Sequence, residues 1–325
     1  MRRKRVALAW WLAPSIQTMG TPQKTLSPQA WAALLALSCI WGASFLSIRI
    51  ALDEIGPFTA VAHRTVWAAL VLWMFVFLRR LPVPRQPKVW LAFLVMGLLN
   101  NVIPFSLMAW GQLHIETGLT AILNAATAIF GVIAAAIFFA DEKLTLRRAL
   151  GVGIGFFGVA TAIGLSSFKS LDLRSLGQLA VIAGTISYAL AGVWARKHLA
   201  GLPPQIAAAG MLAGASVMSL PLAWIIDGPI RFDLQAQTWL AIGYYALIAT
   251  ALAYLLYYRV LAMAGSGNLM LCTLLVAPVA IVLGAVTLGE ALPLRAYVGF
   301  AILGIGLLIL SGRLFKPRQH RLRRA

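Results

Sequence analysis

The sequence predicts an all-α integral membrane protein with ten transmembrane helices, arranged as two inverted five-helix repeats with both termini in the cytoplasm. Of its 325 residues, 61% are hydrophobic and only 11% are charged, with a mean hydropathy of +0.87. Soluble domains carry about 25% charged residues. A helix that crosses a bilayer needs about 20 apolar residues, because its backbone polar groups must pair within the segment. The composition therefore indicates a chain that lies mostly in lipid.

Ten apolar runs, each bounded by charge, Pro or Gly, supply the predicted helices. They lie at 30–51, 57–78, 89–111, 117–140, 149–166, 175–196, 204–226, 236–258, 267–289 and 295–312. We expect the first repeat at 30–167 and the second at 175–312. Segments 1–29 and 313–325 are then basic cytoplasmic tails.

The distribution of charge orients the predicted helices. With the N-terminus inside, the inner segments hold 21 of the 27 Lys and Arg residues, as the positive-inside rule requires. The formal net charge is +18, but the basic residues stand at the ends of apolar runs and do not gather on one domain face. This pattern argues against nucleic acid as a partner.

A motif that recurs after 148 residues predicts the repeat. ADEKLTLRRALG at 140–151 returns as LGEALPLRAYVG at 288–299. The matching pairs are Glu142/Glu290, Leu144/Leu292, Leu146/Leu294, Arg147/Arg295, Gly151/Gly299 and Gly158/Gly306. Each copy contains five spans, and an odd number of crossings inverts the second copy. Inverted repeats are typical of secondary transporters. The hinge residues themselves we interpret as structural: their Glu and Arg pair or cap helices, and their Gly residues allow close helix packing.

The order of several segments resembles the EamA family of the drug/metabolite transporter superfamily. They are IWGASFLSIRIAL at 40–52, HRTVWAALVL at 63–72, and the long stretch at 118–160, with a weaker second copy at 275–310. The resemblance implies a ten-helix carrier of the cell inner membrane, commonly an exporter of amino acids, related metabolites or toxic compounds. Relatives often carry Pro where this chain has Ala128, which weakens the expectation of a helix break there, while the second half keeps Pro278.

Polar and aromatic side chains inside the spans are the candidate substrate contacts, because a polar group in lipid needs a partner. Thr120, Asn124 and Thr127 form one stripe on a helix face. The predicted substrate-binding set is Asn124, Asn101, Asn100, Trp41, Tyr188, Thr120, Thr127 and Tyr254. For the polar members the alternative is hydrogen bonding between helices. Tyr257, near a span end, is interpreted as an interfacial anchor. Arg64 either reaches the outer surface or points into a cavity as an anion contact, and of its roles we favour a structural or vestibule one.

The sequence also bears on the class of function. It lacks a Walker A motif, an HExxH motif and a convergent set of catalytic acids and bases in the spans, and Cys39 and Cys272 lie in apolar runs without a metal-binding spacing. We expect no cofactor and a secondary carrier that moves a small-molecule substrate through the lipid bilayer. The alternative is a membrane-embedded enzyme or flippase that acts on a lipid-linked substrate. A homodimer is left open.

Overall fold

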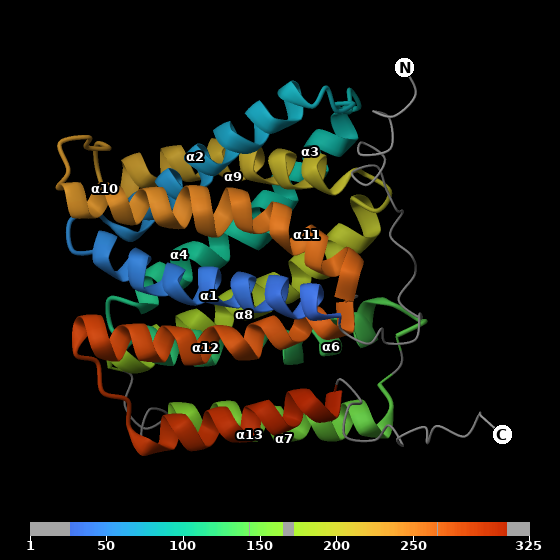
Figure 1. Cartoon of the computed structure of the whole chain (residues 1–325), viewed down its shortest axis with the longest axis vertical. Coiled ribbons are helices and arrows are strands. Elements are labelled where there is room, and N and C mark those ends of the chain that lie inside the picture. The colour runs from blue at the N-terminus through green and yellow to red at the C-terminus, as the bar shows by residue number, and fades with distance from the viewer. Residues whose placement is uncertain (1–26, 143, 165–171, 265, 311–325) are drawn as a thin grey trace.

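The computed structural model describes residues 27–142, 144–164, 172–264 and 266–310. Every regular element in these ranges is a helix, and the helices lie side by side as a bundle (Figure 1). Eight helical stretches are long and apolar enough to cross a membrane, and two shorter apolar helices cover Cys272–Leu288 and Leu294–Leu310. The all-helical membrane fold is therefore confirmed, whereas the ten crossings and the orientation of the termini stay predictions.

The elements follow the predicted runs closely. They are α1 (Pro28–Ala51), α2 (Pro57–Leu78), α3 (Pro87–Gly97), η2 (Leu98–Val102), α4 (Ile103–Gly111), α5 (Thr117–Asn124), α6 (Thr127–Phe138), α7 (Leu146–Ile163), α8 (Leu173–His198), α9 (Pro204–Ile226), α10 (Ala236–Gly243), η4 (Tyr244–Leu252), α11 (Ala253–Ala264), α12 (Ser266–Leu288) and α13 (Leu294–Leu310). Pro57 and Pro204 begin α2 and α9, where proline's missing N–H and fixed φ suit the first helical position.

Large apolar side chains cover the outside of the bundle. Val286, Leu78 and Ile225 are each at least three-quarters exposed. A soluble protein rarely leaves so many large apolar groups in water. In a bilayer the same side chains face lipid tails, so the exposure agrees with the composition.

Helices α7 and α13 pack as an antiparallel pair through equivalent glycines of the two repeats, and they form one end of the bundle in Figure 1. A Cβ built on Gly158 would lie 2.8 Å from the carbonyl oxygen of Gly299, and one built on Gly306 would lie 2.8 Å from that of Gly151. Gly151 and Gly158 correspond to Gly299 and Gly306. Exchanging the repeats therefore converts one contact into the other, as an inverted two-repeat fold requires.

Each repeat also carries a π-helix in the middle of its third span. In the first repeat this third span consists of α3, η2 and α4. In the second repeat it consists of α10, η4 and α11. Shifting η2 by 148 residues places it at 246–250, inside η4. A π-helical turn inserts a residue into the helix and often marks a functional site. The sequence analysis did not predict this pair of π-helices.

The fourth span is interrupted, against the expectation from Ala128. Helix α5 ends at Asn124 and α6 begins at Thr127, and the Thr127 hydroxyl donates to the Asn124 carbonyl at 2.7 Å. A threonine hydroxyl that bonds a nearby carbonyl offers the backbone an alternative to the helical pattern. Helix α12, which retains Pro278, continues through it. Ala128 in place of Pro therefore does not prevent a break in the fourth span.

Candidate functional site

Arg64 of α2 reaches into the interface between the two repeats. It lies seven residues past Pro57, about 10 Å along the helix. Its Nε donates to the Thr250 hydroxyl in η4 at 2.9 Å, and its guanidinium carbon lies 3.8 Å from the centre of the Phe105 ring in α4. A guanidinium over an aromatic face is a cation–π contact. Arg64 therefore connects three spans.

Three of the predicted substrate contacts lie around this arginine. Tyr188 of α8 packs edge-on against Phe105, with ring centres 6.4 Å apart. The Asn100 amide nitrogen in η2 donates to the Tyr254 hydroxyl in α11 at 3.2 Å. Tyr188 and Tyr254 both lie in the neighbourhood of the Arg64 guanidinium. We call Arg64, Asn100, Phe105, Tyr188, Thr250 and Tyr254 the Arg64 cluster.

Trp41 of α1 lies beside the same π-helix. Its indole N–H donates to the carbonyl oxygen of Ala249 at 3.1 Å, one residue before Thr250. Its ring also contacts Tyr257, with centres 5.9 Å apart. Tyr257 therefore packs against a predicted pocket residue, and the interpretation as an interfacial anchor was incomplete.

The other four predicted contacts have separate surroundings. Asn101 in η2 is fully buried, and neither of its amide atoms has a partner among the described residues. The Asn124 side-chain oxygen at the end of α5 is also buried and unpartnered there. Thr120 donates to the Glu116 carbonyl at 3.2 Å, and Thr127 to that of Asn124. The described contacts do not join these four residues to the Arg64 cluster.

All nine Asp and Glu residues of the sequence are described, and all lie outside the helical elements. They are Asp53, Glu54, Glu116, Asp141, Glu142, Asp172, Asp227, Asp233 and Glu290. Each carboxylate accepts from a basic side chain or from a helix N-terminus. For example, Glu116 pairs with Arg174 at 2.8 Å, and Asp227 accepts from the Thr59 amide at 2.6 Å.

Polar contacts hold the loop carboxylates in their charged form. The Arg196 guanidinium hydrogen-bonds Asp141 and holds the pKa of that carboxyl below its usual range. The Ser175 backbone amide lowers the pKa of Asp172 in the same way. A hydrogen bond or a cation at the charged form lowers a carboxyl pKa. These groups therefore act as anchors at the helix ends.

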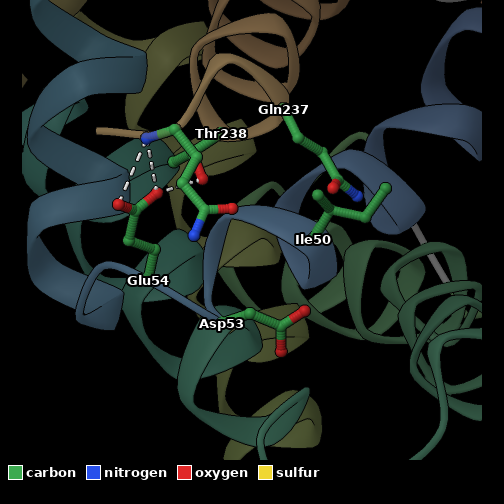
Figure 2. A pocket seen from close by; sticks show the side chains of 6 residues that line it. Ile50, Asp53, Glu54, Gln237 and Thr238 are labelled. Atoms are coloured by element: carbon green, nitrogen blue, oxygen red, sulfur yellow. Dashed lines mark hydrogen bonds between the residues drawn. The ribbon is translucent and has the colours of Figure 1, made fainter.

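A small pocket of about 190 Å³ lies between the end of α1 and the start of α10 (Figure 2). Its lining is Ile50, Asp53, Glu54, Gln235, Gln237 and Thr238. The Glu54 carboxylate accepts from the Gln235 amide at 3.0 Å and from the Thr238 hydroxyl. It therefore caps α10, and none of the predicted site residues lines this pocket.

Comparison with known proteins adds the family. The EamA-like transporter family matches residues 29–164 and again 175–312. The chain belongs to the EamA-like transporter family. The double match agrees with the glycine contacts between α7 and α13, which relate two copies of one unit.

Several relatives of this EamA protein are named as transporters or exporters. It is 19% identical to the uncharacterized transporter YoaV of Bacillus subtilis over 84% of this chain and 94% of that one. It is 27% identical to a protein of Streptantibioticus cattleyicolor named probable terminal-alkyne amino-acid exporter, over 90% of this chain and 97% of that protein. The uncharacterized inner membrane transporter YedA of Escherichia coli is 28% identical over 68% of this chain and 70% of YedA.

A solved crystal structure supports the fold. It superposes with a TM-score of 0.63 at 19% sequence identity, covering 89% of this chain and 99% of the other. The family and the names of its members indicate a multi-pass membrane transporter that binds a small-molecule substrate, rather than an enzyme.

Proposed function

We propose that this EamA protein is a secondary transporter that exports a small metabolite across the cell inner membrane by alternating access. The proposal rests on one observation, that the Arg64 cluster is built from residues of both repeats. Arg64 and Asn100 come from the first repeat, and Tyr188 and Tyr254 from the second. In secondary transporters with inverted repeats the substrate lies between the repeats, near the midplane.

The two π-helices support the same mechanism. Irregular backbone is tolerated at membrane depth where it is buried in protein or lines a cavity. Here η4 supplies Thr250 to Arg64 and the Ala249 carbonyl to Trp41. Residues of one repeat thus contact the irregular part of the other, so that relative motion of the repeats would alter the site directly.

Ten crossings with both termini in the cytoplasm complete the proposal. The repeats occupy 30–167 and 175–312, and the inner segments hold 21 of the 27 basic residues. We propose the predicted set of contacts, including Asn101, Asn124, Thr120 and Thr127, as the substrate region. We propose no homodimer, because neither the family nor the relatives' names support one.

The names of the relatives support the substrate class and the direction of transport. One of them is named an amino-acid exporter and another an inner membrane transporter. We propose an amino acid or a related compound as the substrate, and export as the direction.

The test uses purified protein in proteoliposomes. Vesicles loaded with a panel of unlabelled amino acids, organic anions and organic cations receive traces of the same solute in labelled form. We expect saturable counterflow for at least one solute, and in intact cells faster efflux of that solute than in cells lacking the protein. Absence of counterflow for every class, with monodisperse protein, would contradict the proposal.

A further inference from the structure

The Arg64 cluster contains a positive charge that no acidic side chain of this protein neutralises. Arg64 makes one hydrogen bond, from Nε to the Thr250 hydroxyl, and one cation–π contact, to Phe105. Its two terminal nitrogens have no hydrogen-bond partner among the described residues. An arginine inside a membrane span is expensive and is usually paired. The missing partner therefore calls for an explanation.

The protein's own carboxylates cannot supply that partner. All nine Asp and Glu side chains lie in loops or at helix ends, and each is occupied there. Glu290, for instance, accepts from the Thr117 and Gly118 amides at the start of α5. Glu54 accepts from the Thr238 hydroxyl of α10 across the repeat interface. The Arg64 guanidinium is left with the face of the Phe105 ring and the Thr250 hydroxyl, both uncharged.

A second observation points to a ligand in the same place. Tyr245 of η4 is fully buried, and its hydroxyl has no partner among the described residues. Its backbone carbonyl accepts from the Thr250 hydroxyl at 2.7 Å, and that hydroxyl is the group to which Arg64 donates. Buried polar groups are normally hydrogen-bonded, and each exception requires an explanation. A bound anion would accept from both the guanidinium and a nearby phenol.

We propose that Arg64 binds the carboxylate of the transported substrate, so that the site takes carboxylic acids and zwitterionic amino acids and rejects amines and cationic compounds without a carboxylate. The guanidinium presents two parallel N–H groups that match the geometry of a carboxylate. The rings of Phe105 and Tyr188 provide an apolar surface for the rest of the molecule. A cation would meet Arg64 with no acidic side chain to offset the repulsion.

This inference rests on the proposed transport function and chooses among its substrate classes. The test uses three probes that share a phenyl ring: L-phenylalanine has both a carboxylate and an amine, 3-phenylpropanoate has only the carboxylate, and 2-phenylethylamine has only the amine. Binding is measured as a concentration-dependent rise in the melting temperature of the purified protein. Counterflow of each labelled probe is measured in proteoliposomes.

For the wild type we expect binding and counterflow of the two carboxylates and neither for the amine. Arg64→Gln should weaken carboxylate binding by about 10- to 100-fold, the loss expected for a hydrogen bond to a charged group. Arg64→Lys keeps the charge without the two-pronged geometry, and we expect an intermediate loss. Arg231→Gln removes an exposed arginine that pairs with Asp233, and should behave like the wild type.

Three results would overturn the inference. They are binding of 2-phenylethylamine as tight as that of 3-phenylpropanoate, undiminished carboxylate binding by Arg64→Gln, and no interaction of the wild type with any of the three probes. If Arg64→Gln does not fold, undiminished binding by Arg64→Lys has the same meaning. Counterflow of the amine, or of a cation from the wider panel, would leave the transport function standing while removing the carboxylate site.

Discussion

Trp41 of α1 donates its indole N–H to the Ala249 carbonyl in η4 at 3.1 Å, which connects the first span of one repeat to the π-helix of the other. A π-helical turn disturbs the regular backbone ladder, and the indole satisfies a carbonyl there. The contact lies one residue from Thr250, the partner of Arg64. A single side chain thus supports both the irregular backbone and the residue that positions the guanidinium.

Trp41→Phe keeps an aromatic ring and removes this hydrogen bond. We expect it to destabilise the protein by about 1 kcal/mol and to weaken substrate binding, because η4 loses a support. Trp194→Phe is the matched control, since the Trp194 indole also donates to a carbonyl, that of Ala92, at 3.1 Å. Thermal unfolding should report similar losses for both variants, and transport assays a loss for Trp41→Phe alone. Equal transport by the two would contradict a role for Trp41 in the site.

Asn124→Leu tests the interrupted fourth span. The Asn124 side-chain oxygen is buried without a partner among the described residues, so its removal should leave the melting temperature unchanged or raised. If Asn124 contacts substrate, affinity should fall about tenfold, the equivalent of about 1.4 kcal/mol. Gln178→Leu is the control, because both amide atoms of Gln178 are also buried and unpartnered. Unchanged affinity in Asn124→Leu would remove this residue from the site.

Gly158→Ala tests the packing of α7 on α13. The new Cβ would lie 2.4 Å from the backbone nitrogen of Leu303, and backbone cannot move aside as a flexible side chain can. We expect a loss of about 1–3 kcal/mol from overpacking. Gly153 on the same helix has nothing within 4 Å of such a Cβ, so Gly153→Ala should be neutral or stabilising, by up to about 1 kcal/mol. A similar melting temperature for both variants would show that the pair does not pack this closely.

Glu290→Ala tests a structural role for the repeated hinge motif. The Glu290 carboxylate accepts from the Thr117 amide at 2.9 Å and the Gly118 amide at 3.4 Å, which caps α5. Loss of such a cap should cost about 1 kcal/mol. Asp233→Ala breaks only an exposed pair with Arg231 and should leave the melting temperature close to that of the wild type. If Glu290→Gln abolished proton-coupled transport without unfolding, Glu290 would be a coupling residue rather than a cap.

Cysteine labelling tests the membrane orientation. In a variant whose native cysteines are replaced, Cys at position 85 should be shielded from an impermeant thiol reagent in intact cells, and Cys at position 233 should react. The reason is the excess of Lys and Arg in the segments assigned to the cytoplasm. Permeabilised cells provide the control, in which both positions should react. Labelling of both from outside would refute the ten-span arrangement.

The sequence by itself determined the helices and the repeat, because both depend on local composition. Hydropathy along one segment decides whether it can lie in lipid, and the boundaries 57–78 and 204–226 match α2 and α9. The glycines of the recurring motif predicted close packing, and Gly151 and Gly299 provide it between α7 and α13. The sequence also showed which polar residues lie inside the spans, and for that reason Asn100, Tyr188 and Tyr254 were predicted as substrate contacts.

Only the tertiary structure decided which of these polar residues meet. Arg64, Phe105 and Thr250 are far apart in the chain, and their contacts follow from the packing of α2 against α4 and η4. The adjacent asparagines of η2 and the mostly apolar residues of η4 do not by themselves predict a π-helical turn. The order of residues along the chain also does not show that every carboxylate is occupied at a helix end. Because all the carboxylates are occupied there, the Arg64 charge has no acidic partner. Such pairing depends on distances between helices, which the order of residues along one helix does not contain.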